Sequence, residues 1–429
     1  MNFKIITLGC KVNQYESEAM REMLKKSGFS CANDEETTDI IIVNSCTVTK
    51  TSDSKVTKLL RRERRENTHC VLILTGCMPQ AFPDDHELFE DADIVLGNAL
   101  RSELVSVIES FLTNHQKQIL IHKHENKANF EKMSVSKFDD RTRAFVKIED
   151  GCNRFCSYCI IPYARGRVRS KPLEDLHEEI SKLSQNGYKE IVLVGINLSA
   201  YGQDIGCDLF DAIKIANDTK GIERVRLGSL EPERLDITTI EKLSKLEKLC
   251  PQFHLSLQSG CDETLKRMNR HYNTDEYRKI VENLRSFFKN ASVTTDIMVG
   301  FAGETDEEFE KSINFVKEIG FSKMHVFPYS RRKGTVAYDA PNQVNEAIKT
   351  KRTNIMLKAA EESRVEFLEG QIGKTELVLF EKANQDGYFE GYTENYTPVF
   401  VKTNENLSGF ILPVKNISCN KDSCFGELC

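Results

Sequence analysis

Short apolar runs alternate with amphipathic helical segments along most of the chain. In the first hundred or so residues these runs are FKIITLG, DIIIVNS, CVLILTG and ADIVLGN (3–9, 39–45, 70–76 and 92–98). Near-continuous apolar strands separated by helices are typical of parallel sheets that helices cover on both faces. The alternation predicts an α/β protein that begins with a parallel α/β domain over residues 1–113.

The alternation stops over residues 114–140, which are polar and indicate a linker. It restarts over residues 141–370 with six strand candidates, each followed by a helical pattern. The candidates are 144–148, 190–195, 224–228, 253–257, 292–298 and 323–328. Six such units predict an open, partial (β/α)6 barrel, which would bind its ligands at the C-terminal ends of the strands.

Residues 371–429 have a different character, with short strand-like runs and no helical pattern. They predict a small antiparallel β-barrel, an architecture common among oligonucleotide-binding modules. The aromatic residues here would either stack on bases or fill the barrel core; they are Tyr388, Phe389, Tyr392 and Tyr396.

The charge and the cysteine content limit the function. The net charge of −6 gives no global attraction to nucleic acid, so such a partner would need local basic patches. There is no apolar run near 18 residues and no basic-then-apolar leader, which predicts a cytoplasmic protein without a membrane partner. In a reducing compartment, 14 cysteines favour metal binding or catalysis over a disulfide framework.

Three cysteines of the first domain, here called the N-terminal trio, share one placement. Cys10, Cys46 and Cys77 each come directly after a predicted parallel strand. Open α/β sheets place their ligands at this edge, so the fold would bring the three thiols together. The trio predicts a metal or cluster site, and the alternative is three buried turn cysteines.

A second group, the central trio Cys152, Cys156 and Cys159, lies in GCNRFCSYCIIPYARG (151–166), after the first barrel strand. Thiolates suit iron–sulfur clusters or zinc. Zinc requires a fourth Cys or His at short spacing, and none occurs between Cys159 and His177. Three thiolates on a four-iron cluster would leave one iron open to a small chelating ligand, which indicates a catalytic site.

The spacing Cys152-x3-Cys156-x-Tyr158-Cys159 matches the signature of the radical S-adenosylmethionine (SAM) superfamily. The whole chain resembles the methylthiotransferase family, which has an N-terminal domain with three separated cysteines, a radical SAM barrel and a small RNA-binding TRAM barrel. The matching stretches are TLGCKVNQYES, VNSCTVT, LTGCMPQ, CSYCIIPYARGRVRS, LGSLEP, LSLQSG, DIMVGFAGET and GYTENY.

The resemblance implies two [4Fe–4S] clusters. The central trio would hold the cluster that cleaves SAM, and the N-terminal trio would hold an auxiliary cluster through which sulfur is delivered. Each turnover would use two SAM molecules, one as methyl donor and one as radical source, with electrons from a donor such as flavodoxin or ferredoxin. Further SAM contacts are predicted at Tyr158, Gly195, Ser229, Glu231 and Gln258.

The resemblance also implies an RNA substrate, the anticodon stem-loop of tRNA. Five arginines near the predicted active edge could bind phosphates, namely Arg165, Arg167, Arg169, Arg331 and Arg332. Within the family the chain looks most like the branch that methylthiolates N6-threonylcarbamoyladenosine at position 37. The alternatives are the N6-isopentenyladenosine branch and the branch that modifies an aspartate of ribosomal protein S12.

Functions of other classes are a non-catalytic iron–sulfur protein that binds RNA, an electron carrier, and a different radical SAM enzyme. An electron carrier needs fully ligated clusters, so two three-cysteine sites argue against it. The small terminal barrel argues against an enzyme for small molecules. The cysteines Cys419, Cys424 and Cys429 are expected to lie in a flexible terminal tail.

Overall fold

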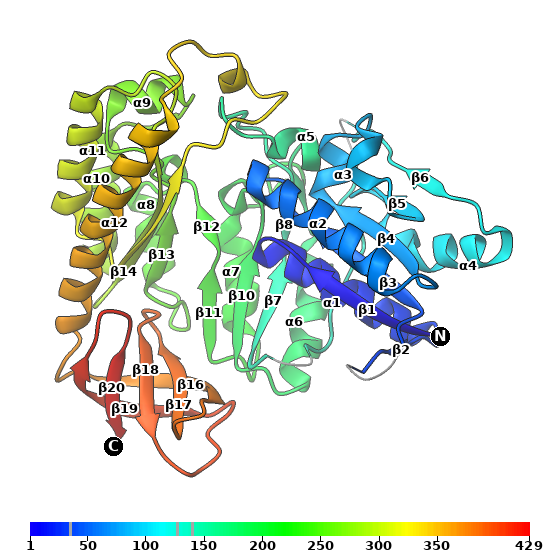
Figure 1. Cartoon of the computed structure of the whole chain (residues 1–429). Helices are drawn as coiled ribbons and strands as arrows, with labels where there is room; N and C mark the ends of the chain where they lie inside the picture. The colour runs from blue at the N-terminus through cyan, green and yellow to red at the C-terminus, as the bar shows by residue number, and fades with distance from the viewer. Residues whose placement is uncertain (34–36, 126–127, 139–140) are drawn as a thin grey trace.

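The computed structural model describes residues 1–33, 37–125, 128–138 and 141–429. It begins with a six-stranded parallel sheet in the order β2-β1-β3-β4-β5-β6, which confirms the predicted parallel α/β domain (Figure 1). Its strands are β1 Asn2–Thr7, β2 Ser30–Cys31, β3 Ile40–Ser45, β4 Val71–Gly76, β5 Ile94–Leu96 and β6 Gln118–Leu120. Strand β6 lies in the segment predicted as a linker, so that prediction is wrong for residues 118–120.

Helices cover both faces of this sheet because its central strands are apolar on both sides. Ile40 and Ile42 pack in one core with α1 and α4, whereas Ile41 and Val43 pack in another with α2. The helices are α1 Lys11–Lys26, α2 Lys50–Glu66, α3 Cys77–Ala81 and α4 Leu104–Asn114. Both α1 and α3 begin at the C-terminal edge of the sheet, where the N-terminal trio lies.

The central domain is an open barrel of parallel strands, as predicted. One sheet has the order β11-β10-β7 and the other β12-β13-β14-β15, and Gly228 separates β11 from β12. The strands are β7 Arg143–Lys147, β10 Glu190–Val194, β11 Arg224–Leu227, β12 Ser229–Leu230, β13 Gln252–Leu255, β14 Ser292–Val299 and β15 Lys323–Pro328. Because β11 and β12 are successive pieces of one path, the six predicted strands are all present.

Helices and a short ribbon complete the central domain. The helices are α5 Ile161–Arg165, α6 Leu173–Gln185, α7 Leu209–Asp218, α8 Ile237–Ser244, α9 Asp262–Arg267, α10 Thr274–Phe287, α11 Asp306–Ile319 and α12 Glu346–Glu369. Strands β8 Glu149–Asp150 and β9 Arg169–Ser170 pair antiparallel and bracket the loop that carries the central trio.

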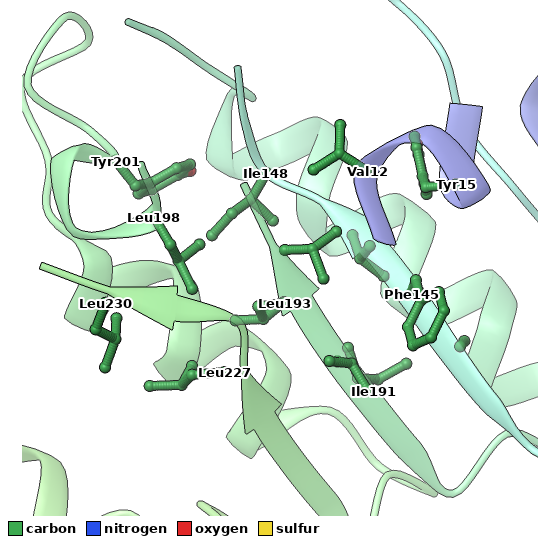
Figure 2. Close-up of a cluster of buried hydrophobic side chains, with 14 of the residues drawn as sticks. Val12, Tyr15, Phe145, Ile148, Ile191, Leu193, Leu198, Tyr201, Leu227 and Leu230 are labelled. Carbon is green, nitrogen blue, oxygen red and sulfur yellow. The ribbon is translucent and has the colours of Figure 1, made fainter. Parts of the chain in front are cut away.

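One hydrophobic core runs from the first domain into the barrel. Figure 2 shows Val12 and Tyr15 of α1 beside Phe145 of β7, with Ile191 and Leu193 of β10 further along the same cluster. The hydroxyl of Tyr15 donates to the Met133 carbonyl at 2.8 Å, which ties the segment before β7 to the same contact. This packing fixes the start of α1, and therefore Cys10, against the barrel.

The C-terminal domain is a closed barrel in the order β16-β17-β18-β20-β19. Its strands are β16 Thr375–Ala383, β17 Tyr388–Thr393, β18 Pro398–Lys402, β19 Ile411–Cys419 and β20 Cys424–Leu428. Cys419 and Cys424 therefore belong to strands, and the predicted flexible tail is wrong. Because β20 pairs parallel with β18, the barrel is also not purely antiparallel.

Buried arginines dock the small barrel under the N-terminal ends of the central strands (Figure 1). Arg224 donates to the carbonyls of Tyr392 at 3.0 Å and Leu377 at 2.7 Å, and Arg226 donates to the Glu394 carbonyl at 2.8 Å.

In the described part of the chain, no helix combines the length and the apolar character that crossing a membrane requires.

Candidate active site

The N-terminal trio lies at the C-terminal ends of three neighbouring strands. Cys10 follows β1, Cys46 follows β3 and Cys77 follows β4, and β3 pairs with both other strands. Burial raises the pKa of Cys10 and Cys46, and the neighbouring Cys77 thiol adds to both shifts, as a group of the same charge held close by does. The structure thus brings together three cysteines that are far apart in the sequence.

Glycines before Cys10 and Cys77 allow these loops to pack closely. Gly9 (φ +122°) and Gly76 (φ +101°) both adopt backbone angles that disfavour other residues. A Cβ on Gly9 would lie 2.8 Å from the Cys46 Cβ, and a Cβ on Gly76 would lie 2.4 Å from the Ser45 carbonyl oxygen. A side chain at either position would push the cysteine loops apart.

Nitrogen donors surround the sulfur of Cys77. The Arg165 Nε donates to Cys77 Sγ at 3.3 Å, and the Asn98 Nδ2 lies 4.0 Å from the same sulfur. Burial raises the pKa of Cys46 to about 11, although Arg165 opposes this shift. Burial alone therefore favours the neutral thiol, and a bound metal supplies the positive charge that stabilises thiolates in such a place.

The central trio lies in the loop between β8 and α5. Backbone hydrogen bonds within the loop hold its shape. The Cys152 N–H donates to the Gly166 carbonyl at 3.0 Å, and the Cys159 N–H donates to the Cys156 carbonyl at 3.0 Å. Burial raises the pKa values of Cys152 and Cys159 to about 12, and the neighbouring Cys156 thiol adds to both shifts.

Polar donors also point at the sulfurs of the central trio. The Arg154 N–H and the Asn197 Nδ2 lie 3.4 Å and 3.6 Å from Cys152 Sγ, and the Arg270 Nη1 lies 3.2 Å from Cys156 Sγ. Hydrogen bonds to cluster sulfurs are a means by which proteins tune such groups. Arg270 was missed from the sequence, since it lies in no motif and the fold alone brings it to Cys156.

The residues of the two trios fit iron–sulfur clusters better than a single metal ion. In the described ranges, no three His, Cys, Asp or Glu side chains are arranged to hold a single metal ion. The donor atoms favour iron–sulfur clusters, because each trio consists only of thiols, which are the ligands such clusters prefer. Each trio is also in contact with an arginine.

Two buried acceptors beside Cys152 lack partners. Glu149 is fully buried, and its Oε2 accepts from the Asn197 N–H at 2.7 Å, while Glu149 Oε1 and Asn197 Oδ1 accept no hydrogen bond from any described residue. Burial raises the pKa of Glu149 to about 8. Unpaired buried acceptors require a donor, and the ammonium group of an amino acid ligand such as SAM would supply one. These residues fit the implied ligand.

The five predicted SAM contacts occupy different settings. Gly195 has no room for a side chain, since a Cβ there would lie 2.7 Å from Glu149 Oε2. Glu231 pairs with Arg270, the same arginine that contacts Cys156. Ser229 is exposed, Tyr158 packs edge-on against Phe301, and Gln258 adopts a positive φ of 67°. Their roles stay predictions.

Three of the five arginines predicted to bind RNA are buried, and those predictions are wrong. Arg165 is fully buried between Glu16 and Asp150. Arg169 Nη1 donates to the carbonyls of Arg165 and Arg167, and Arg332 binds Asp53 at 2.6 Å and Thr47 at 2.7 Å. Phosphates cannot reach these guanidinium groups. Arg167 and Arg331 are exposed.

Arg165 belongs to a buried charge network that the sequence did not reveal. Glu16 of α1 binds Arg165 and Arg101 at 2.6 Å and Lys147 at 2.7 Å, and Lys147 binds Asp150 at 2.6 Å. Burial raises the pKa of Glu16, but the three cations together outweigh it and lower the pKa to about 2. The network joins the first domain to the barrel behind Cys77.

We expect Arg165→Met to lower the free energy of unfolding by about 3–5 kcal/mol, because it removes one partner from a buried ionic network. Urea denaturation of anaerobically prepared protein, followed by circular dichroism, measures this. Arg167→Met is the matched control on the same loop: its exposed guanidinium lies over Phe155, 4.7 Å from the ring centroid, and we expect a loss of about 1 kcal/mol or less. Equal losses would show that burial of Arg165 contributes nothing.

A loop after β15 connects the two trios. Arg332 contacts Thr47, next to Cys46, and the Ala337 N–H donates to the Ser157 carbonyl at 2.7 Å, between Cys156 and Cys159. The loop therefore holds the two cysteine sites at a fixed separation.

A cavity of about 680 Å³ opens between the first domain, the barrel and the small barrel. Cys10 and Gly195 line it at the end near the two trios, and Tyr396 lines it at the end near the small barrel. Burial lowers the pKa of Lys11, another lining residue, to about 8, and the nearby guanidinium groups of Arg143 and Arg226 add to the shift. The volume suits a small ligand or a single nucleoside.

Two family models match the chain. Residues 146–316 match the Radical SAM superfamily, and residues 2–97 match Uncharacterized protein family UPF0004.

Curated relatives extend over nearly the whole chain. The threonylcarbamoyladenosine tRNA methylthiotransferase MtaB of Bacillus subtilis is 36% identical over 95% of this chain and 92% of its own length. The MtaB of Thermotoga maritima is 40% identical over 92% of this chain and 89% of its own length. The tRNA-2-methylthio-N(6)-dimethylallyladenosine synthase of Pelotomaculum thermopropionicum is 34% identical over 96% of this chain and 94% of its own length.

Solved structures share the fold at low identity. The radical SAM methyltransferase TsrM of Kitasatospora setae, with cobalamin and a [4Fe–4S] cluster bound, has a TM-score of 0.59 at 12% identity over 79% of this chain and 77% of its own. The cobalamin-dependent SAM radical enzyme OxsB has a TM-score of 0.52 at 11% identity, over 84% of this chain and 56% of its own.

Proposed function

Because this chain belongs to the radical SAM tRNA methylthiotransferase family, we propose that it methylthiolates N6-threonylcarbamoyladenosine at position 37 of tRNA. The observation that carries the proposal is the presence of two separate all-cysteine trios, each after a strand, together with a cavity that Cys10 lines. The two MtaB relatives, at 36% and 40% identity, favour this substrate over the isopentenyl derivative.

The central trio would hold the [4Fe–4S] cluster that binds SAM, and the N-terminal trio would hold the auxiliary [4Fe–4S] cluster. When bound, these clusters and two SAM molecules supply the radical chemistry and the methylthio group that replace the C2 hydrogen. The task of the chain is to hold the reactants in place and to exclude water.

Individual side chains support that task. Arg165 and Asn98 donate toward Cys77, and Arg270 donates toward Cys156 while it holds Glu231. Glu149 and Asn197 would accept the ammonium group of SAM, with Gly195 leaving room for it. Tyr158, Ser229, Glu231 and Gln258 would complete the SAM site.

The remaining parts would bind RNA. Arg167 and Arg331 are exposed and would contact phosphates of the anticodon stem-loop. The domains would be residues 1–113, 141–370 and the TRAM-like 371–429, joined by the predicted linker apart from its strand β6; residues 126–127 and 139–140 of that linker lie outside the described ranges. A cytoplasmic location and an electron donor such as flavodoxin or ferredoxin complete the proposal.

Mass spectrometry of tRNA nucleosides from cells with and without the gene tests the function. We expect the 2-methylthio derivative of N6-threonylcarbamoyladenosine to disappear on deletion and to return, to about its original level, when the intact gene is restored. The parent nucleoside should accumulate in its place, because only the last step is lost.

The same spectra distinguish the alternatives. Loss of the methylthio isopentenyl derivative instead would assign the chain to the other tRNA branch. Unchanged spectra for both nucleosides would contradict tRNA methylthiolation altogether. Restoration by a gene that carries Cys152→Ala would show that the protein acts without its proposed SAM-binding cluster.

A further inference from the structure

The cavity beside Cys10 is lined by polar side chains on three successive barrel strands. Side chains two residues apart in a strand point to the same face, so each strand contributes a pair to the interior. The pairs are Gln252 and His254 of β13, Thr294 and Asp296 of β14, and Lys323 and His325 of β15. An interior filled only for stability would be apolar, so this polarity points to a ligand.

The fixed charges of the cavity are mostly positive. Lys11 and Lys323 line it, and neither forms an ion pair with any described residue. Asp296 is the one carboxylate among the lining residues, and it already lies 3.2 Å from the Nε2 of His254. Two ammonium groups therefore face a cavity whose lining holds one carboxylate, and that carboxylate already contacts His254.

Gln252 adds an amide that faces the cavity. The residue is only 7% exposed, lines the cavity and forms no side-chain hydrogen bond to any described residue. An amide in this position can both donate to and accept from a ligand in the cavity. His254 is held in place by Thr294, 3.0 Å from its Nδ1, so the wall around Gln252 is ordered rather than loosely packed.

This lining suits a ligand that carries an anion together with groups that form hydrogen bonds. A threonylcarbamoyl substituent carries a carboxylate, a hydroxyl and a urea, whereas an isopentenyl substituent carries only carbon and hydrogen. Covering two unpaired ammonium groups with an alkenyl chain would cost free energy, because it desolvates charge without compensation.

We propose that Lys323, with Lys11 and Gln252, binds the carboxylate of the N6 substituent and so selects the threonylcarbamoyl nucleoside. The inference rests on the proposed function and specifies how this cavity recognises the substrate. Cys10 borders the same cavity, so a nucleoside held there lies next to the N-terminal trio. A carboxylate is also present in SAM and negative charge in RNA phosphates, so the experiment must separate these sources.

The test compares Lys323→Met with the wild type on two synthetic anticodon stem-loops. One carries N6-threonylcarbamoyladenosine, and the other carries the same group with its carboxylate converted to a neutral carboxamide. We expect the variant to lower kcat/KM for the acid by at least about tenfold, and to change kcat/KM for the amide by about twofold or less. Lys323→Arg, which keeps the charge, should retain most of the activity.

Two further measurements accompany the kinetics. Fluorescence anisotropy should show the same loss of affinity for the acid stem-loop and none for the amide, independently of turnover. Lys279→Met, on the outer face of α10, is the matched control and should behave as the wild type with both substrates. Thermal unfolding and iron content should match in all proteins, because Lys323 is exposed.

The outcomes separate the possibilities. Equal losses with acid and amide would overturn the inference in favour of a contact to RNA phosphate. A raised KM for SAM with unchanged stem-loop affinity would overturn it in favour of the carboxylate of SAM. Wild-type protein that is inactive on the acid stem-loop would overturn the proposed function itself, and this inference with it.

Discussion

Replacing Cys152 with alanine is expected to reduce 5′-deoxyadenosine formation to the level seen without protein. The Cys152 sulfur accepts hydrogen bonds from the Arg154 N–H and the Asn197 Nδ2. The Asn197 N–H in turn donates to the buried Glu149, which would face SAM. The central trio has only three thiols, so loss of one leaves too few ligands for a stable cluster. The bound iron should fall from about eight to about four atoms per chain, since the other trio is unchanged.

Anaerobic reconstitution followed by iron analysis and chromatography of the SAM products measures both effects. Cys429→Ala is the matched control, because Cys429 is exposed at the chain end and belongs to neither trio. It should keep the full iron content and full SAM cleavage. Persistent 5′-deoxyadenosine formation by Cys152→Ala would remove the central trio from the proposed site.

The parallel sheets and the positions of both trios could be predicted because each depends on local pattern. Residues 40–45 and 71–76 are short, mostly apolar runs, which are typical of strands covered on both sides, and Cys46 and Cys77 follow them directly. Because parallel strands end at the same edge of a sheet, the strand directions alone predict that these thiols lie together, and no tertiary contact needs to be known.

Properties that depend on distant contacts could not be predicted in this way. Arg165 looked like a surface base beside the cysteine loop, yet it is buried because Glu16, 149 residues earlier, lies opposite it. A charged residue gives no local signal that distinguishes a phosphate contact from a buried ion pair. Strand β20 was missed because CFGEL is short and becomes a strand only through pairing with β18 and β19.

The buried network and the loop after β15 suggest why the two trios share one rigid unit. Helix α5 begins two residues after Cys159, and its last residue, Arg165, contacts Cys77. Arg332 and Ala337 make a second connection on the other side. Chemistry that uses both sites on one nucleoside needs their separation fixed, and buried ionic contacts hold orientation more strictly than apolar packing alone.

Because the two trios would each hold their own cluster, Cys46→Ala should separate the two halves of the proposed reaction. Cys46 lies in the first domain, and the residues that surround the central trio come from the barrel. We therefore expect 5′-deoxyadenosine formation to stay within about tenfold of the wild type, while methylthio product falls by at least about 100-fold. Removing outer partners of metal ligands already costs about 10–100-fold, and this change removes a ligand itself.

The measurement is a single-turnover reaction with the threonylcarbamoyl stem-loop, in which 5′-deoxyadenosine and methylthio nucleoside are quantified from the same sample. Cys31→Ala is the matched control: Cys31 also lies in the first domain at a strand, but outside the trio. It should give both products in the wild-type ratio. Normal methylthio yield from Cys46→Ala would contradict a sulfur-delivering role for the N-terminal trio, whereas loss of both products would mean that SAM cleavage itself depends on the first domain.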